Sequence, residues 1–156
     1  MIRRRRAEDL DPLCALLKTA HYPAAHLTPR GWLEEHDAEQ SWVFDMAPVS
    51  VAPTKNVVGH VQVYAPEEDL LALVGPMHDG RDLLVIGKLF VRPDTYEHGI
   101  ARFLVRESAR YVEDRGMHPV LEHRAHGRLS TAFCERLGFQ TVTSRNSGVA
   151  VMTYTR

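Results

Sequence analysis

The segment with the clearest chemical potential is a short polar loop that joins an apolar run to a helical pattern. Residues 92–105 read RPDTYEHGIARFLV and directly follow the run LLVIGKLFV. A helix start leaves about four backbone N–H groups without intrahelical acceptors, and the helix dipole adds about half a positive charge there. Where little side-chain bulk intervenes, phosphate oxygens can approach such amides closely. The loop therefore predicts an anion site.

The residues of the loop leave a second interpretation open. Gly99 and Ala101 are small, and His98 and Arg102 can add donors. The loop contains neither the G-K-[ST] of a phosphate-binding P-loop nor the G-x-G-x-x-G of a dinucleotide site. A tight turn that only packs a helix onto a sheet would explain the same residues.

The surrounding patterns predict the elements that hold this loop. Apolar alternation and apolar runs indicate strands, and apolar residues at helical spacing indicate helices. We expect strands at 2–6, 41–46, 56–64, 83–91 and 118–123, a hairpin turning at 146–148, and helices at 10–20, 32–38, 67–74, from the loop to 116, and at 128–139. This order predicts an α/β protein with a central mixed β-sheet and helices on both faces.

Three details of these elements are specific enough to test. Thr28-Pro29 should start the second helix. Val57, Val61 and Val63 should share one face of their strand, with His60, Gln62 and Tyr64 on the other. The helix after the loop should bury a stripe of apolar side chains: Ile100, Phe103, Leu104, Tyr111 and Val112.

Over essentially its whole length the chain resembles the GNAT family of N-acetyltransferases. The resemblance rests on LFVRPDTYEHGIARFLV, on the later AFCERLGF, and on the order of strands and helices. Residues 89–93 match the apolar-Val-x-Pro end of the family's strand. Residues 96–101 match its [RQ]-x-x-G-x-[GA] loop, and residues 137–139 match its Leu-Gly-Phe. The resemblance implies a GNAT-like acyl-CoA N-acyltransferase fold.

The resemblance also implies acetyl-CoA as cosubstrate. Main-chain groups at 89–91 would bind the pantetheine arm, amides at 97–102 would hold the pyrophosphate, and the strands around 85–91 and 120–123 would splay apart to admit the thioester. Ser130 would face the cofactor beside Cys134. The implied cofactor-binding residues are Leu89, Phe90, Val91, Tyr96, Glu97, His98, Gly99, Ile100, Ala101, Arg102 and Ser130.

Three positions depart from the family pattern. Tyr96 stands where Arg or Gln is usual, which removes one side-chain donor to the phosphates. Glu97 would repel a pyrophosphate if its side chain faced it, so we expect that side chain to point to solvent. Gly127 falls where the family often has Asn.

Acetyl transfer to an amine needs a neutral amine, a donor to the oxyanion and a proton for the thiolate. Phe90 or Val91 would supply the oxyanion donor through its N–H group. Cys134 stands where many family members carry an acidic tyrosine; it is either the proton donor or a small apolar core residue, in which case solvent supplies the proton. The base is Glu122 or His123, or His60 or Asp45, or there is none, since Val85 and Gly87 at the family's usual base positions do not titrate.

Recognition of the acceptor falls to two segments, residues 21–37 and the insertion at 65–82. Their aromatic rings and carboxylates suit a cation. The alternative is a solvated helix with Trp32 packed inward. The candidate residues are His21, Tyr22, His26, Trp32, Glu34 and Glu35.

Composition and charge narrow the classes of function and location that the chain can have. The 156 residues, 44% hydrophobic with a net charge of −1, predict one domain at 1–156 and argue against a nucleic-acid partner. No run approaches the roughly 18 apolar residues of a membrane span. The two cysteines fit no metal-ligand spacing, and a reducing cytoplasm is expected. A monomer and a homodimer are equally compatible with the sequence.

These observations predict an acetyl-CoA-dependent N-acetyltransferase that acts on a primary amine, by direct attack of that amine on the thioester. A small-molecule amine is favoured over a protein or peptide amine. The alternative is a catalytically weak or inactive acyl-CoA-binding regulatory module of the same fold.

Overall fold

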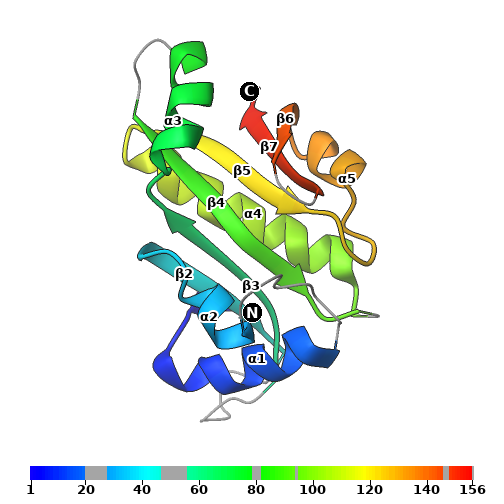
Figure 1. Ribbon diagram of the computed structural model, residues 1–156. Coiled ribbons are helices and arrows are strands. Elements are labelled where there is room, and N and C mark those ends of the chain that lie inside the picture. Colours follow the sequence, from blue (N-terminus) through cyan, green and yellow to red (C-terminus); the bar gives the residue numbers. More distant parts are fainter. Residues whose placement is uncertain (20–27, 47–55, 79–81, 94, 146–147, 156) are drawn as a thin grey trace.

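The computed structural model describes residues 1–19, 28–46, 56–78, 82–93, 95–145 and 148–155. Within them, seven strands form one sheet in the order β1-β2-β3-β4-β5-β7-β6 (Figure 1). Neighbouring strands are antiparallel except β4 and β5, which run parallel. The strands are β1 (Ile2–Arg4), β2 (Ala38–Asp45), β3 (Val57–Tyr64), β4 (Leu83–Val91), β5 (His118–Arg124), β6 (Phe139–Arg145) and β7 (Val149–Tyr154).

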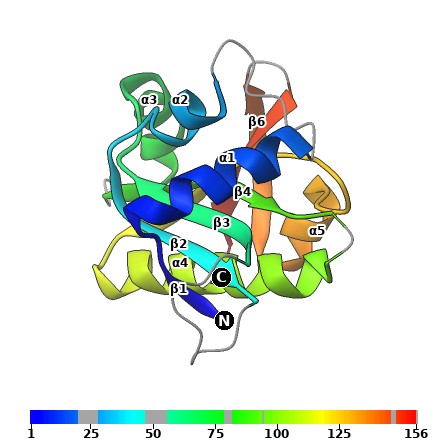
Figure 2. The ribbon, with the colours of Figure 1, turned by 90° about the horizontal axis from the view of Figure 1, so that it is seen from below.

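Helices cover both faces of this sheet, which confirms the predicted mixed sheet. Figure 2 shows α1, α2 and α3 on one side of the strands and α4 and α5 on the other. The helices are α1 (Leu10–Thr19), α2 (Pro29–Leu33), α3 (Glu68–Val74), α4 (Glu97–Asp114) and α5 (Thr131–Arg136), with short 3-10 turns at Ala7–Asp9 and Gly75–His78. None of the helices in the described ranges is long and apolar enough to cross a bilayer.

The largest buried cluster lies between α4 and the sheet, because α4 presents a continuous apolar stripe. Ile100, Leu104 and Val112 are buried there against Val61 and Val63 of β3. A second cluster lies under α1 and includes Leu13 and Leu17. The third lies beside α3 and includes Tyr64, Val85 and Val120.

The second helix starts where the sequence predicts and ends earlier. Thr28 Oγ1 accepts a hydrogen bond from Gly31 N at 3.0 Å, and Pro29 occupies the first turn. The helix stops at Leu33, and the predicted extension to Ala38 is wrong because Ala38 already pairs with Tyr64 in the sheet. Pairing in the sheet has overridden the weak helical pattern at the end of this segment.

Two predictions about side-chain faces are also corrected. Phe103 of the predicted apolar stripe is about half exposed, since it lies on the outer side of α4. Val57 packs in the α1 cluster rather than with Val61 and Val63, because the β2–β3 register shifts between Phe44 and Asp45. An irregularity in register moves a side chain to the other face.

The arginine run at residues 3–6 begins in the edge strand β1 and is not wholly solvated. Arg3 bridges Asp9 at 2.8 Å and Asp45 at 3.0 Å, and these contacts raise its pKa above the ordinary value. Arg5 reaches inward to His60. The run thus ties the first strand to the second and third.

Candidate active site

The parallel strands β4 and β5 pair over only part of their length. The pairing runs from Leu83 opposite His118 to Ile86 opposite Leu121, although β4 continues to Val91 and β5 to Arg124. Beyond this point β5 stays paired to β7 and β4 stays paired to β3. The two strands separate toward their carboxyl ends (Figure 1). This opening is the slot that the sequence predicts between them.

A bulge in β4 marks the place where the strands begin to part. The segment from Gly87 to Phe90 holds one residue more than the facing segment from His60 to Gln62. Lys88 takes up the extra residue with a φ of 54°, a left-handed conformation. Such a conformation costs an ordinary residue about 1–2 kcal/mol, so neighbouring contacts must hold it in place.

The side chain of Lys88 leaves the bulge toward α2. Its Nζ donates to Glu35 Oε1 at 2.6 Å and lies 4.4 Å from the centre of the Trp32 ring. The carboxylate provides a counter-charge and a hydrogen-bond acceptor, and the ring face provides a cation–π contact, so together they compensate for the burial of the ammonium group. Trp32 and Glu35 of the predicted acceptor set therefore border the slot, whereas Glu34 is exposed and pairs with Arg30. His21, Tyr22 and His26 lie outside the described residues.

The helix that follows β4 starts with an open amino end. Tyr96 is the N-cap residue, with a φ of 42°, and its side chain makes no capping hydrogen bond. Ile100 N donates to Tyr96 O at 3.2 Å, so the amides of Glu97, His98 and Gly99 precede the first intrahelical bond. This is the geometry that the anion site requires.

Tyr96 and Gly99 are fitted to each other at this helix start. The phenol ring of Tyr96 is 82% exposed and lies against Gly99, where a Cβ atom would clash with it. Ile100 and Ala101 turn into the core, and Arg102 is exposed. The main chain of the first turn and the exposed side chains of Tyr96 and Arg102 are available to meet a ligand.

The expectation that Glu97 points to solvent is wrong. The side chain is buried, and its Oε2 accepts a hydrogen bond from Arg128 N at 3.1 Å. A Cβ atom at Gly127 would crowd this oxygen, so the glycine makes room for the carboxylate. His98 donates from Nε2 to Arg128 O at 2.6 Å and stacks on Phe133. The first turn of α4 is thus clamped to the loop before α5.

The predicted main-chain segment of β4 lies along the slot with its side chains packed away. Leu89 and Val91 are buried in the cluster under α4. Phe90 points to the opposite face, where its ring centre lies 5.9 Å from that of Trp32. The backbone between them borders the gap toward β5.

Cys134 lies in the core below α5. It is 0% exposed, and burial raises the pKa of its thiol to about 12. A group of that pKa is a poor proton donor at neutral pH, so the structure favours the apolar alternative that the sequence left open. Ser130 is the N-cap of α5, and its Oγ accepts a hydrogen bond from Phe133 N at 3.1 Å. Its contact with a cofactor stays a prediction.

Glu122 faces the α3 side of the sheet at the start of the slot. Tyr64 O–H donates to Glu122 Oε1 at 3.1 Å across β4. Burial raises the pKa of Tyr64 well above its ordinary value, and the Glu122 charge adds to the effect, so the phenol stays protonated and can donate. The phenol ring lies over Gly87, where a Cβ atom would clash with the hydroxyl.

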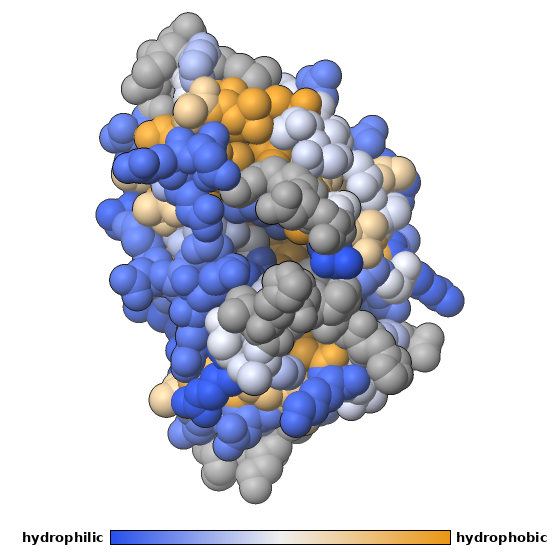
Figure 3. All heavy atoms as spheres, viewed as in Figure 1, coloured by the Kyte–Doolittle hydropathy of each residue, from blue (hydrophilic) through white to orange (hydrophobic). Residues whose placement is uncertain are grey.

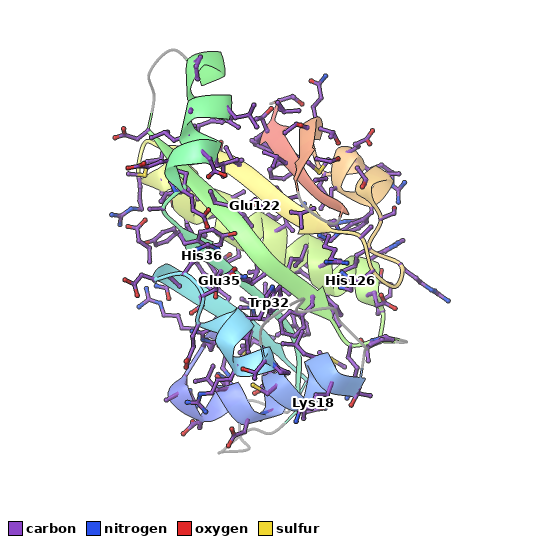
Figure 4. All side chains as sticks on the ribbon, in the orientation of Figure 1. Lys18, Trp32, Glu35, His36, Glu122 and His126 are labelled. Carbon is purple, nitrogen blue, oxygen red and sulfur yellow. The ribbon has the colours of Figure 1, made fainter. Side chains whose placement is uncertain are left out.

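A second ring extends this polar group toward α2. His36 stacks on Tyr64 with ring centres 4.1 Å apart, and it contacts Glu35 at 3.3 Å and Glu67 at 3.7 Å. In Figure 4, Glu122, His36, Glu35 and Trp32 follow one another along the same face, away from Lys18 on α1. The space-filling view shows this face hollowed near its centre (Figure 3).

The other candidate bases are engaged elsewhere. His60 is 0% exposed and contacts Arg5 and Lys88. His123 is buried, with Nε2 2.8 Å from Leu129 O. Asp45 is paired with Arg3. Burial lowers the pKa of His60 to about 3 and that of His123 to about 4.

The lowered pKa values of His60 and His123 predict that the folded protein loses stability in mild acid. In the unfolded chain both histidines take up a proton near pH 6.5. In the folded protein their pKa values are lower, about 3 for His60 and about 4 for His123, so they stay neutral until the pH falls to those values. The free energy of unfolding should therefore fall by about 1.4 kcal/mol per pH unit for each histidine below pH 6. Urea unfolding between pH 7 and 4.5 measures it. His123→Gln should reduce the slope by about 1.4 kcal/mol per pH unit, and an unchanged slope would contradict the assignment.

A cavity of about 880 Å³ lies on the opposite face, between α4 and α5, and His98 at the start of α4 lines it. Phe133 and Leu137 contribute apolar surface. Arg102, Arg106 and Arg136 also line it. Glu113 and Asp114 line it as well, but arginines outnumber these acids, so the cavity continues from the helix start as a predominantly basic groove.

Sequence reasoning missed three residues of the site: Tyr64, His36 and Lys88. One signal was available, because Lys88 is a lone charge inside the apolar run LLVIGKLFV. Tyr64 and His36 gave no local signal. Their roles depend on the alignment of β3 with β4 and on the position of α2, which connect residues distant in sequence.

Comparison with known proteins identifies the family of the chain. The model of the acetyltransferase (GNAT) family matches residues 10–139. The chain belongs to that family, and the general reaction of the family is acetyl transfer. No curated protein matches the chain significantly.

Solved structures share the fold at low identity. Arabidopsis thaliana NAA60 in complex with a bisubstrate analogue is 16% identical, with 99% of this chain and 97% of that chain covered and a TM-score of 0.71. An aminoglycoside 6'-acetyltransferase type Ii is 17% identical, with 99% and 96% covered and a TM-score of 0.70. The PaiA N-acetyltransferase from Thermoplasma acidophilum, in complex with coenzyme A, is 13% identical, with 100% and 98% covered and a TM-score of 0.63.

Proposed function

We propose that this protein transfers the acetyl group of acetyl-CoA to a primary amine of a small molecule, by direct attack of the amine on the thioester. One observation carries the proposal. The slot between β4 and β5 has an open helix start beyond its wide end and the carboxylate of Glu122 beside its narrow end. The helix start suits the diphosphate of the cosubstrate, and the carboxylate can take the proton of the attacking amine.

The residues of the chain fit acetyl-CoA. The amides of Glu97, His98 and Gly99 would receive the pyrophosphate, with Arg102 close by. The burial of Glu97 against Arg128 directs its charge away from that anion. The structure of the Thermoplasma protein, which is similar in fold, is a complex with coenzyme A, and this supports coenzyme A as the ligand. When bound, acetyl-CoA supplies the activated acetyl group.

The main chain of β4 supplies donors on the slot side at alternate residues. Arg92 N donates to Val58 O at 2.7 Å, toward β3. N–H groups alternate in direction along a strand, so Phe90 N–H also points to β3, and Leu89 and Val91 N–H point to the gap. Of the two oxyanion donors predicted from sequence, Val91 keeps its N–H on the slot side and Phe90 does not. Leu89 joins it as a candidate.

Glu122 is the base in this proposal. An alkylammonium has a pKa near 10 and no lone pair, so it must first lose one proton to solvent; the neutral amine then attacks, and a remaining N–H proton becomes acidic as the C–N bond forms. The carboxylate accepts that proton while its Oε1 is held by Tyr64. The C–S bond then breaks, and solvent protonates the coenzyme A thiolate because Cys134 is buried with a raised pKa.

The face around Glu122 suits a cationic acceptor. Glu67 contacts His36, whose ring stacks on Tyr64 beside Glu122, while Lys88 already engages the Glu35 carboxylate and the Trp32 ring. Carboxylates and aromatic faces attract ammonium groups. The aminoglycoside 6'-acetyltransferase of similar fold supports a small-molecule amine. A cytoplasmic location and the choice between monomer and homodimer stay predictions.

Calorimetry and turnover together test this function. We expect coenzyme A to bind, and free thiol to be released from acetyl-CoA in the presence of at least one member of a panel of polyamines, amino sugars and arylalkylamines. Binding without turnover by any amine would favour the regulatory module. No heat at millimolar coenzyme A would refute both cofactor-dependent functions.

A further inference from the structure

His60 is a fully buried polar residue for which the acetyl transfer described above has no use. Its Nδ1 lies 2.8 Å from the carbonyl oxygen of Lys88, at the bulge of β4. Its Nε2 lies 3.0 Å from NH1 of Arg5. The ring also stacks on Phe90, with centres 5.3 Å apart. The contacts connect Arg5, which directly follows β1, to the residue where β4 leaves regular geometry.

The two partners fix the protonation state of the ring. A carbonyl oxygen only accepts hydrogen bonds, so Nδ1 must carry the hydrogen. A guanidinium group only donates, so Nε2 must be the acceptor. His60 is therefore a neutral imidazole with one defined tautomer, and its complete burial agrees with that state.

The direction of the Lys88 carbonyl also sets the direction of the next N–H group, that of Leu89. A trans peptide is planar, and its C=O and N–H bonds point in opposite directions. Because His60 on β3 holds the Lys88 oxygen, the N–H group of Leu89 in the same peptide points away from β3. That direction leads into the gap where β4 and β5 have separated.

The peptide between Lys88 and Leu89 needs a restraint that peptides in regular strands do not need. Lys88 has a φ of 54°, and β4 is irregular there. Lys88 and Leu89 have no partner residue in either neighbouring strand, so no ladder hydrogen bond holds this peptide directly. A side-chain donor with a fixed tautomer provides the missing restraint.

We propose that Arg5 and His60 form a positioning relay that aims the N–H group of Leu89 at the thioester oxygen; the proposal rests on the acetyltransferase function above. When the amine attacks, the carbonyl oxygen becomes an oxyanion and Leu89 N–H donates to it. His60 touches neither substrate nor cofactor. Its contribution is the preset direction of the donor, which spares reorganisation during the reaction.

Variants at residue 60 separate this role from simple packing. His60→Phe keeps a ring against Phe90 and removes the donor to Lys88 O. In His60→Asn the side-chain nitrogen takes the place of Nδ1 and keeps that donor. We expect His60→Phe to lower kcat by about 10- to 100-fold, less than the complete loss of an oxyanion donor, with KM for acetyl-CoA changed less than about threefold. His60→Asn should recover most of kcat, and Arg5→Met should lose kcat by about threefold to tenfold.

An amide signal gives a readout besides activity. The probe is the analogue of acetyl-CoA in which a methylene group replaces sulfur, so that its ketone oxygen takes the place of the thioester oxygen. In the wild type, its binding should shift the Leu89 amide proton downfield. His60→Phe should bind the analogue but lose that shift, and His60→Asn should keep it.

The possible outcomes are distinguishable. If wild-type protein does not bind the analogue, the cofactor-dependent function fails and the relay fails with it. If it binds and turns over normally while folded His60→Phe keeps both kcat and the Leu89 shift, only the relay is overturned. Equal losses of kcat in folded His60→Phe and His60→Asn would also overturn it.

Discussion

Glu122→Gln should lower kcat about 10²- to 10⁴-fold, the usual worth of a positioned general base. The amide keeps the shape of the carboxyl group and can still accept from Tyr64 O–H. It cannot take the proton from the attacking nitrogen. Affinity for coenzyme A should stay within about twofold, because the proposed pyrophosphate contacts lie at the start of α4 and not at β5. Steady-state thiol release and calorimetry measure the two quantities.

The matched control is Glu135→Gln, an exposed glutamate on α5. It makes the same chemical change away from the slot and should leave kcat within about twofold, since exposed substitutions have small effects. A loss of less than about threefold in Glu122→Gln would contradict the assignment of the base. The protein would then take amines of lowered pKa without a dedicated base, the alternative that the sequence left open.

The sequence predicted those parts of the site that depend on neighbouring residues. The run at 83–91 is one strand because its apolar character is continuous, and Thr28-Pro29 start α2 because cap chemistry is local. The same holds for the open start of α4 after Tyr96. In each case a few adjacent residues determine the backbone.

The errors lie where residues distant in sequence meet. Glu97 is buried because Gly127 and Arg128, on another loop, receive its carboxylate. Lys88 enters a bulge because β3 and β4 differ by one residue in register, which no local pattern reports. Phe103 falls outside the buried stripe because α4 packs on the sheet along one narrow face. Strand register and helix orientation are tertiary properties, so a single sequence leaves them open.

Gly87→Ala should damage both stability and turnover, because of a single methyl group. The new Cβ atom would clash with the hydroxyl of Tyr64 and crowd its ring. Tyr64 is buried between His36 and the sheet, so the ring cannot move freely. We expect the free energy of unfolding to fall by about 1–3 kcal/mol, the usual cost of overpacking. We also expect kcat to fall at least about tenfold, because Glu122 loses its orienting donor. Urea unfolding and thiol release measure the effects.

A double-mutant cycle separates the clash from a general effect of alanine. Tyr64→Leu removes the ring atoms that the Cβ atom would meet, so Gly87→Ala should cost about 1–2 kcal/mol less stability in that background. Turnover should stay low, because leucine cannot hold Glu122. Gly75→Ala is the control, since its Cβ atom would meet Leu71 at an ordinary 3.6 Å, and stability should change by less than about 0.5 kcal/mol. If the costs of Gly87→Ala and Tyr64→Leu add independently, the ring does not lie over Gly87. The link between β3 and the base on β5 would then have to be abandoned.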